Sequence, residues 1–496
     1  MSLEQAWILK RASLTPTKLA LINLETNEQW TYEQLTNEIA KWCHFFEHEH
    51  LQAGDRIAVL ARNHIHLVAI LFACGLRGLI YVPLNWRLSP EELTGILADA
   101  TPSFLIYDEE MQCPITFEKM QSTQFHSETT ASPNIRLMDL NDPWLMIYTG
   151  GTTGKAKGVV LSYNSINWNA INTIISWGLS ENDCTLNYMP MFHTGGINAL
   201  CMPLLMAGGT VIIGDKFDAE KALTAINHYK TTISLFVPTM YQAMIATSYF
   251  KENSFPTVNV FLSGGAPCPL PIYEAFFKKG LYFKEGYGLT EAGPNNFYIS
   301  REDAYVKKGA VGKSMQFNEV KIVNKAGNTC EPNEIGELLV KGKHMFMFYW
   351  NNPYETAQSI QNGWLKTGDL AKMDHDGYYY IVGRKKEMII CGGENVYPKE
   401  VEQCILRHSL VKEVAVIGAP DAYWGEVVLA FIVCHHQTKA ILEEIALLCK
   451  THLGSYKMPK KILFIDELPK TIVGKIDKQA LHLEFEGRVD QHINGL

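Results

Sequence analysis

The stretch that most constrains this chain runs from Met146 to Val160 and reads Met-Ile-Tyr-Thr-Gly-Gly-Thr-Thr-Gly-Lys-Ala-Lys-Gly-Val-Val. Glycines let backbone N–H groups turn toward one point, hydroxyls add donors, and Lys155 and Lys157 supply positive charge, so the stretch predicts a phosphate-binding loop. A Walker loop needs Gly-Lys-Ser/Thr at the start of a helix, whereas Ala156 follows the lysine here and a β-branched run comes next. The chain is therefore not a P-loop NTPase. For the loop alone, a Gly/Thr-rich hairpin turn that binds nothing is the competing interpretation.

Length and composition bound the protein class. A chain of 496 residues is too long for one core and predicts at least two domains. Its net charge of -8 argues against a nucleic-acid-binding surface, and eleven scattered cysteines without paired spacing argue against a disulfide framework or a structural zinc site. The start, Met1 to Leu9, does not resemble a signal peptide, and the apolar window Leu67 to Leu84 contains Arg77 and reads as a buried helix, turn and strand. We expect a cytoplasmic protein without an integral membrane segment.

Helical and strand-like patterns alternate along the first part of the chain, which predicts βαβ units and a mostly parallel sheet. Between residues 109 and 142 lies a polar segment that we expect to be an irregular surface connection, and residues 309–340 read as a small β subdomain. Around residue 383 a new βα pattern of about a hundred residues begins, the size of a small domain. The expected strands are at 56–60, 80–84, 104–107, 210–213, 234–237 and 258–262, and the expected helices are at 31–47, 66–79, from Ser162, at 218–230 and from Thr239.

Several motifs in order resemble the AMP-forming acyl-CoA synthetase and adenylation superfamily, and the resemblance spans essentially the whole chain. It implies an α/β fold in which a large N-terminal domain of mostly parallel α/β sheets, with a small β subdomain, is hinged to a small α+β C-terminal domain. Residues 1–385 would bind ATP and the acyl substrate, and the mobile residues 386–496 would carry the catalytic lysine and the CoA tunnel. The motifs are Tyr-Thr-Gly-Gly-Thr-Thr-Gly-Lys at 148–155, Ser-Gly-Gly-Ala-Pro at 263–267, Gly-Tyr-Gly-Leu-Thr-Glu at 286–291, Thr-Gly-Asp at 367–369, Gly-Arg-Lys-Lys at 383–386 and Gly-Lys-Ile at 474–476.

The resemblance implies three cosubstrates or cofactors: ATP, Mg²⁺ and coenzyme A. Glu291 would supply a hard oxygen ligand to the magnesium ion, and Thr290 would hydrogen-bond the α-phosphate. A carboxylate such as Asp369 can accept both ribose hydroxyls. The other residues that the resemblance places on the nucleotide are Thr149, Gly150, Gly151, Thr152, Thr153 and Lys157 in the phosphate loop, Gly265, Ala266 and Tyr287 around the adenine, and Arg384 on the ribose.

Catalysis would centre on Lys475. A carboxylate that attacks a phosphate brings two anions together, so a mobile ammonium that bridges them stabilises the transition state. The resemblance also counts Thr290, Glu291 and His193 among the catalytic residues, with His193 as a gate between the acyl pocket and the CoA tunnel. It makes Lys386 the hinge, Gly392 and Gly393 the wall of the pantetheine tunnel, and Lys457 and Lys460 partners of the CoA phosphates.

The acid that the chain activates is predicted from small side chains in the expected pocket, which are Thr194, Gly195, Ala199, Pro294 and Asn295. These leave room for an extended apolar chain, and Gly150 and Ala156 are similar to the long-chain fatty acyl-CoA synthetase pattern, so a medium- or long-chain fatty acid is favoured. Aryl acids and o-succinylbenzoate remain alternatives. Two further alternatives are an adenylation domain that loads a carrier protein and an inactive, ligand-sensing relative, against which the intact Lys475, Glu291 and Asp369 argue.

Overall fold

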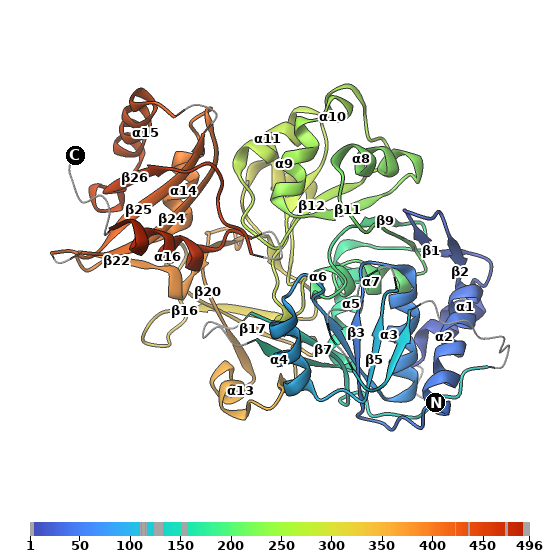
Figure 1. The fold of residues 1–496 in the computed structure, drawn as a ribbon. Coiled ribbons are helices and arrows are strands. Elements are labelled where there is room, and N and C mark those ends of the chain that lie inside the picture. Colours follow the sequence, from blue (N-terminus) through green and yellow to red (C-terminus); the bar gives the residue numbers. More distant parts are fainter. Residues whose placement is uncertain are drawn as a thin grey trace.

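Figure 1 shows a large α/β part followed by a smaller one, as the sequence motifs imply. This computed structural model describes residues 4–109, 111, 115, 117–123, 132–150, 156–421, 423–434, 437–471 and 475–489. The large part contains two seven-stranded sheets and a small β subdomain. Within the described residues, no helix is long and apolar enough to cross a membrane.

The first seven-stranded sheet holds the expected βαβ units. Its central strands β3 (Arg56–Leu60), β4 (Ile80–Leu84) and β5 (Phe104–Tyr107) have the bounds that the sequence predicted, and they pair in parallel. The expectation of an irregular segment between residues 109 and 142 was wrong in part, because β6 (Met120–Ser122) pairs with the edge of β5. The sheet continues through β7 (Pro143–Thr149), β8 (Lys157–Ser162) and β18 (Phe348–Tyr349).

The second seven-stranded sheet ends its parallel strands at the loops that carry the nucleotide motifs. β12 leads into the stretch at 263–267, and β13 leads into the stretch at 286–291. Ligands in open α/β sheets bind at such carboxyl ends. In spatial order the strands are β13 (Phe283–Glu285), β12 (Val260–Ser263), β11 (Ile233–Phe236), β9 (Cys184–Asn187), β10 (Thr210–Ile213), β1 (Leu19–Asn23) and β2 (Gln29–Thr31).

Helices pack on both sheets and begin where the sequence places capping residues. Thr31 and Gln34 form a capping box at the start of α2, as predicted. The helix α3 (Ile65–Arg77) is buried along most of its length, and a Cβ added at Gly75 would lie 2.6 Å from the Trp144 ring, so only glycine allows this contact. The other helices of the large part are α1 (Trp7–Leu14), α2 (Tyr32–His48), α4 (Pro90–Ala100), α5 (Tyr163–Trp177), α6 (Thr194–Ile197), α7 (Cys201–Ala207), α8 (Ala219–His228), α9 (Pro238–Ala246), α10 (Ser248–Glu252), α11 (Leu270–Lys278), α12 (Arg301–Val306) and α13 (Pro353–Ser359).

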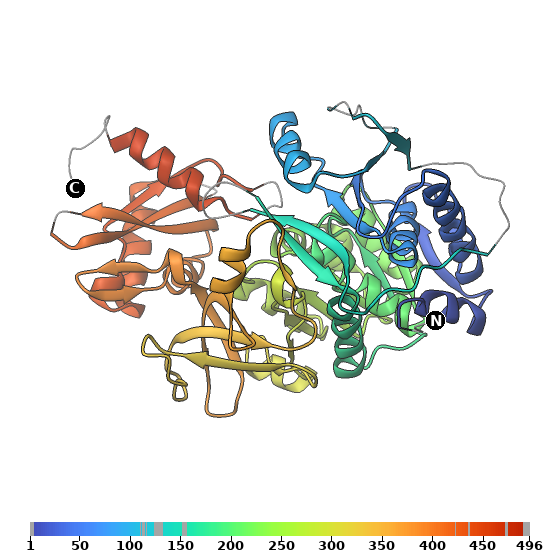
Figure 2. The same ribbon diagram turned by 90° about the horizontal axis from the view of Figure 1, so that it is seen from below.

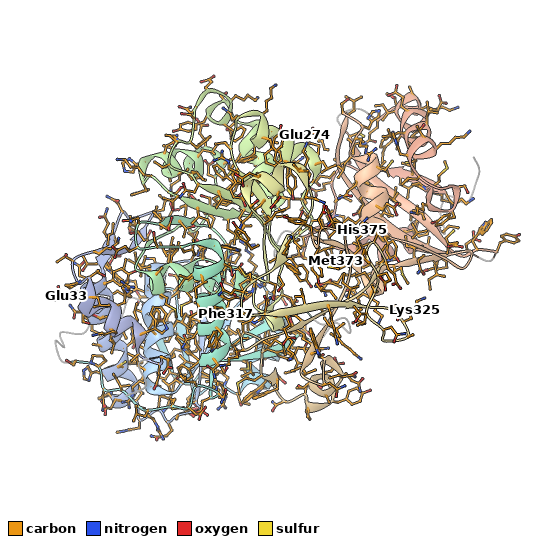
Figure 3. All side chains as sticks on the ribbon, turned by 180° about the vertical axis from the view of Figure 1, so that it is seen from behind. Glu33, Glu274, Phe317, Lys325, Met373 and His375 are labelled. Carbon is orange, nitrogen blue, oxygen red and sulfur yellow. The ribbon has the colours of Figure 1, made fainter. Side chains whose placement is uncertain are left out.

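The predicted β subdomain is present. Its strands β16 (Glu319–Val323) and β17 (Gly336–Lys341) are antiparallel, and the turn after β16 is held by the Asn324 side chain, which accepts hydrogen bonds from two backbone N–H groups. Figure 3 shows Lys325 in this turn, far from Glu33 on α2. The sheet is completed by β19 (Ile360–Gln361), β20 (Trp364–Met373) and β21 (Tyr379–Arg384). A separate two-stranded sheet consists of β14 (Phe297–Tyr298) and β15 (Lys313–Ser314).

The small part has its own core and follows a short 3₁₀ turn at Lys385–Glu387. The long hairpin of β24 (Val411–Asp421) and β25 (Gly425–Cys434) separates two apolar clusters, one under α14 (Pro398–Ile405) and α15 (Lys439–His452) and the other under α16 (Lys478–Val489). Figure 2 shows this part, in orange and red, beside the β subdomain. Its other strands are β22 (Ile389–Cys391), β23 (Glu394–Val396) and β26 (Lys461–Phe464).

Candidate active site

The centre of the candidate site is a buried carboxylate between a tyrosine and an arginine. Asp369 on β20 is 4% exposed and faces Arg384 on β21, whose Nε lies 2.8 Å from Asp369 Oδ1. The Tyr287 hydroxyl donates to Asp369 Oδ2 at 2.5 Å. Burial raises the pKa of the Asp369 carboxyl, and Arg384 and the hydrogen bond from Tyr287 act in the opposite direction. The structure thus brings together three residues that the sequence separates by almost a hundred positions.

Lys475 of the small part belongs to this group. Its backbone N–H donates to Thr471 Oγ1 at 3.2 Å, next to an antiparallel bridge between Lys470 and Ile476. Although the residue is exposed as a whole, its pKa is lowered, first by partial desolvation of the ammonium and then by the positive charge of Arg384, while Asp369 and Glu387 raise it. These couplings place the ammonium within electrostatic reach of the Asp369 and Arg384 pair.

His193 is coupled to the same lysine. It precedes α6, and its Nε2 is buried without a hydrogen-bond partner among the described residues. Burial, with Lys475 and Arg87 nearby, lowers the pKa of the imidazole to about 4. The ring is therefore neutral at pH 7, and it lies against the Phe192 ring with centroids 4.7 Å apart.

The glycine-rich loop connects two antiparallel strands, because Thr149 on β7 pairs with Lys157 on β8. This confirms the strand predicted after the loop. Gly150 is exposed at the start of the loop, whereas Gly151, Thr152 and Thr153 lie outside the described residues. Lys157 was predicted to contact phosphate, and in this structure its Nζ lies 2.8 Å from Glu355 Oε2 on α13.

Glu291 also has a partner that the sequence does not reveal. The Tyr349 hydroxyl donates to Glu291 Oε1 at 2.8 Å, and the Lys157 ammonium lies 5.5 Å from the centre of the same tyrosine ring. Thr290, which precedes Glu291 in a 3₁₀ turn, is buried. The Tyr349 side chain thus contacts both Glu291 and Lys157, which begins the second strand of the loop hairpin.

The predicted adenine wall is formed at the ends of β12 and β13. Gly265 has a left-handed φ of +81° and is exposed, and the neighbouring Ala266 is half-buried. Tyr287 packs its half-buried ring near Phe297, with centroids 5.8 Å apart. Both loops leave the same edge of the parallel sheet, so Gly265 and Tyr287 lie on one side of it.

The predicted acyl-pocket residues lie around α6. Thr194 and Gly195 are half-buried in the first turn of this helix, and Ala199 follows it and is buried. Asn295 is buried as well, and its Nδ2 donates to the Ala199 carbonyl oxygen at 2.8 Å. The adjacent Pro294 lies directly against Gly288, where an added Cβ would come within 2.2 Å of the Pro294 backbone. The Asn295 amide therefore holds the wall of this region together.

The residues predicted to contact CoA lie on the small part. Gly392 and Gly393 form the turn between β22 and β23, both with left-handed φ, and a Cβ at Gly392 would lie 2.7 Å from the Trp424 ring. The Lys460 ammonium lies 5.5 Å from the centre of that ring. Lys457 makes hydrogen bonds of 2.7 and 2.8 Å to the two oxygens of Glu400. In the described part of the chain, no hydrogen bond or ion pair joins these residues to the group around Asp369.

The predicted hinge residue, Lys386, is in the 3₁₀ turn between the two parts. Its neighbours are anchored on opposite sides. Lys385 lies 2.7 Å from Glu337 of the β subdomain, and Glu387 lies 3.5 Å from Lys478 on α16. Lys386 thus lies between one residue paired with the β subdomain and another paired with α16.

Sequence reasoning missed Tyr349, Glu355 and Arg87. Glu355 lies 198 positions after Lys157, so no local pattern joins the two residues. The sequence signal near Tyr349 and Glu355 is Pro353, which marks the start of the short helix that carries Glu355.

A separate group away from the site contains Glu28, His64 and His66, whose ligand atoms lie within 4.8 Å of one another. Here His64 Nδ1 accepts the His66 N–H at 3.3 Å, and the Trp30 indole donates to Glu28 at 2.8 Å. Each of these bonds is local, and the contact that joins the β2 hairpin to the start of α3 is the edge-on packing of the Trp30 and His66 rings, whose centroids lie 4.8 Å apart. At the start of a helix the dipole disfavours a cation.

Comparisons with known proteins match most of the chain. The family model of the AMP-binding enzymes matches residues 8–350, and that of the AMP-binding enzyme C-terminal domain matches residues 400–475. A feruloyl-CoA synthase from an Amycolatopsis species is 34% identical over 97% of this chain and 98% of the relative. An indoleacetate–CoA ligase of Aromatoleum aromaticum is 33% identical, with 95% and 96% covered.

Two solved structures are similar over nearly their full length. The o-succinylbenzoate-CoA synthetase of Bacillus subtilis, in complex with its acyl-adenylate intermediate, has a TM-score of 0.87 and 32% identity, over 96% of this chain and 97% of that one. A fatty acyl-CoA synthetase of Mycobacterium tuberculosis has a TM-score of 0.77 and 30% identity, over 98% of both chains.

Proposed function

Because the chain belongs to the AMP-binding enzyme family, we propose that it is an acid–CoA ligase that activates a carboxylic acid with ATP and transfers it to coenzyme A. The first half-reaction gives an acyl-adenylate and pyrophosphate, and the second gives the thioester and AMP. The proposed reaction does not involve nucleic acid. The cytoplasmic location of the protein stays a prediction.

The observation that carries the proposal is the electrostatic coupling of Lys475 to Asp369 and Arg384, which form an ion pair of 2.8 Å. Attack of a carboxylate on the α-phosphate increases negative charge where two anions meet, and an ammonium aimed at that point stabilises the transition state. Arg384 and Asp369 would hold the ribose hydroxyls, and the Tyr287 hydroxyl fixes the Asp369 carboxylate on the other side. The neutral His193 would then gate the acyl pocket without a change of charge.

The phosphates would lie over the loop hairpin. Thr149, Gly150 and Lys157 border the loop on the described side, and Lys157 would exchange Glu355 for a phosphate oxygen. Such an exchange costs little, because ion pairs that water reaches contribute only about 0–1 kcal/mol. Thr290 would donate to the α-phosphate, and Gly265, Ala266 and Tyr287 would border the adenine.

Glu291 fits a magnesium ion. Its Oε1 is held by the Tyr349 hydroxyl, so the second carboxylate oxygen is oriented, and Mg²⁺ prefers such hard oxygen ligands. When bound, the ion would neutralise charge on the phosphate oxygens.

For the second half-reaction, we propose that the small domain, residues 386–496, turns against residues 1–385 about Lys386. The turn would withdraw Lys475 and bring Gly392 and Gly393 toward the acyl-adenylate, where a chain without side chains leaves space for a thin pantetheine arm. Lys457 and Lys460 would meet the CoA phosphates, Lys457 after release from Glu400. AMP is then a good leaving group for attack by the CoA thiol.

The acid is the part of the proposal that departs from the sequence-based preference. The names of the relatives, feruloyl-CoA synthase and indoleacetate–CoA ligase, support an aromatic acid, and they do not support a fatty acid. The likeness to one fatty acyl-CoA synthetase structure does not offset this, because the o-succinylbenzoate enzyme has the higher TM-score and identity. We therefore propose an aryl or arylalkanoic acid as substrate, bordered by Thr194, Gly195, Ala199, Pro294 and Asn295.

The test is ATP-dependent pyrophosphate release over a panel of acids, with and without CoA. The panel contains ferulate, indoleacetate, benzoate, 2-succinylbenzoate, acetate, octanoate and palmitate. We expect release with an aromatic acid and formation of its CoA thioester. A maximum on octanoate or palmitate would restore the fatty acid, and pyrophosphate without thioester would point to a carrier protein as the acceptor. No release with any acid would refute the ligase proposal.

A further inference from the structure

One lysine of the small domain reaches a buried carboxylate of the large domain. Lys399 is the second residue of α14, and its Nζ lies 4.0 Å from Glu285 Oε1 at the end of β13. The same ammonium donates to the Ile381 carbonyl oxygen of β21 at 2.9 Å. The two side chains are only 11% and 6% exposed, so the pair is withdrawn from water.

The position of Lys399 in its helix has no local explanation. The first turn of a helix carries a partial positive charge that disfavours a lysine there. The residue gains from contacts across the domain boundary, with Glu285 and Ile381, rather than from its own helix. A lysine at this place therefore indicates a tertiary role.

Glu285 is held from the other side as well. The Tyr273 hydroxyl donates to its Oε2 at 3.0 Å. Burial raises the pKa of the Glu285 carboxyl, and Lys399 and the Tyr273 hydrogen bond lower it, so the lysine favours the ionised form. Glu285 directly precedes the stretch Gly286–Glu291, which forms part of the candidate nucleotide site. Lys399 is thus attached to the strand end that positions this site.

We propose that Lys399 is a positioning residue that holds the small domain in the orientation in which Lys475 faces the nucleotide. This inference rests on the proposed function, in which the small domain turns between the half-reactions. Such a turn separates Lys399 from Glu285, and a buried charge that loses its partner is strongly unfavourable. A second hydrogen bond across the boundary, from Gln242 Nε2 to the Lys412 carbonyl oxygen at 3.3 Å, is neutral and exposed and selects less between orientations.

The expected effect is a change in the balance between the half-reactions. Coupling between two such states typically amounts to roughly 5- to 150-fold. We expect Lys399→Met to slow acyl-adenylate formation about ten-fold or more. Thioester formation from supplied acyl-adenylate should stay equal to wild type or rise, because the orientation that it needs no longer competes with a buried ion pair.

The experiment measures both half-reactions with the full-length protein and the acid that gives the most pyrophosphate in wild type. Pyrophosphate release reports the first, and conversion of synthetic acyl-adenylate with CoA reports the second. Glu285→Gln keeps the shape and the Tyr273 contact and should shift the balance in the same direction. Lys399→Arg should restore most of the first half-reaction, and the exposed Lys450→Met of α15 is the matched control.

The outcomes separate the inference from the proposed function. Wild type without pyrophosphate release for any acid would refute the function itself. If wild type is active and Lys399→Met lowers both half-reactions equally, or leaves the first unchanged, the positioning role is wrong. A Lys399→Met, Glu285→Gln double variant that loses no more than either single variant would support a single shared contact. Additive losses would overturn it.

Discussion

A buried lysine in the large domain allows one quantitative prediction about stability. Lys284 on β13 is 4% exposed, and its ammonium lies 4.2 Å from the centre of the Trp177 ring and 5.5 Å from that of Tyr298. Burial lowers the pKa of this lysine from 10.5 to about 7. Because its pKa is near 10.5 in the unfolded chain, the unfolded state binds more protons between pH 7 and pH 10.5. The free energy of unfolding therefore rises with pH in that window and is lowest below pH 7.

The size of the effect follows from the shift. A change of three to four pKa units corresponds to about 5 kcal/mol of destabilisation at pH 7 and below. The contact with Trp177 favours the charged form and offsets this by up to ~2 kcal/mol. We therefore expect Lys284→Met, which keeps the aliphatic volume, to raise the free energy of unfolding by about 3 kcal/mol at pH 6 and by much less at pH 10.

The assay is urea unfolding of wild type and variant at pH 6, 8 and 10, followed by tryptophan fluorescence and far-UV circular dichroism. A higher midpoint with an unchanged slope identifies a change in stability. The exposed Lys278→Met on α11 is the control and should show no such dependence on pH. A variant that is less stable than wild type at pH 6, or whose gain does not depend on pH, would refute the assignment of a buried, destabilising ammonium to Lys284.

Three predictions concern the reaction. Lys475→Ala should slow acyl-adenylate formation roughly 10²–10³-fold, the usual loss for one electrostatic donor, and spare thioester formation from supplied acyl-adenylate; equal losses in both assays would contradict its role. Gly392→Leu should block thioester formation selectively, since the φ of +59° at Gly392 and the Trp424 ring leave no room for a side chain. Gly393→Ala should have a milder effect, because no atom lies within 4 Å of the added Cβ. Full CoA transfer in Gly392→Leu would contradict the tunnel assignment. His193 has a pKa of about 4, so its imidazole does not titrate near neutral pH. The kcat/KM values of wild type and His193→Phe should therefore follow the same pH profile between pH 5.5 and 8. A change in kcat/KM near pH 6.5 that only wild type shows would disprove the neutral state of His193.

Local patterns in the sequence were sufficient for much of the fold. The strands at 56–60, 80–84, 104–107 and 210–213 have the predicted bounds, and Thr31 caps its helix as expected. These features depend on residues within about four positions of each other, where apolar periodicity and capping act. The strands β6 (Met-Gln-Ser) and β9 (Cys-Thr-Leu-Asn) were missed, because polar residues interrupt the apolar run that marks strands of similar length such as β5 and β10, and these two strands are fixed by pairing with their neighbours.

The sequence by itself determined the order of the motifs, the α/β class and the residue types that an adenylate-forming site needs. Only the tertiary structure decided their partners: Lys157 beside Glu355, Glu291 beside Tyr349, and Lys399 beside Glu285. The electrostatic coupling of Lys475 to Asp369, more than a hundred residues away, depends on how the small domain packs against the large one. Such pairings depend on burial and on the approach of separate elements, which local sequence patterns do not encode. For the same reason the identity of the acid could not be predicted from the small pocket side chains alone. The shape of the pocket depends on all the residues that enclose it.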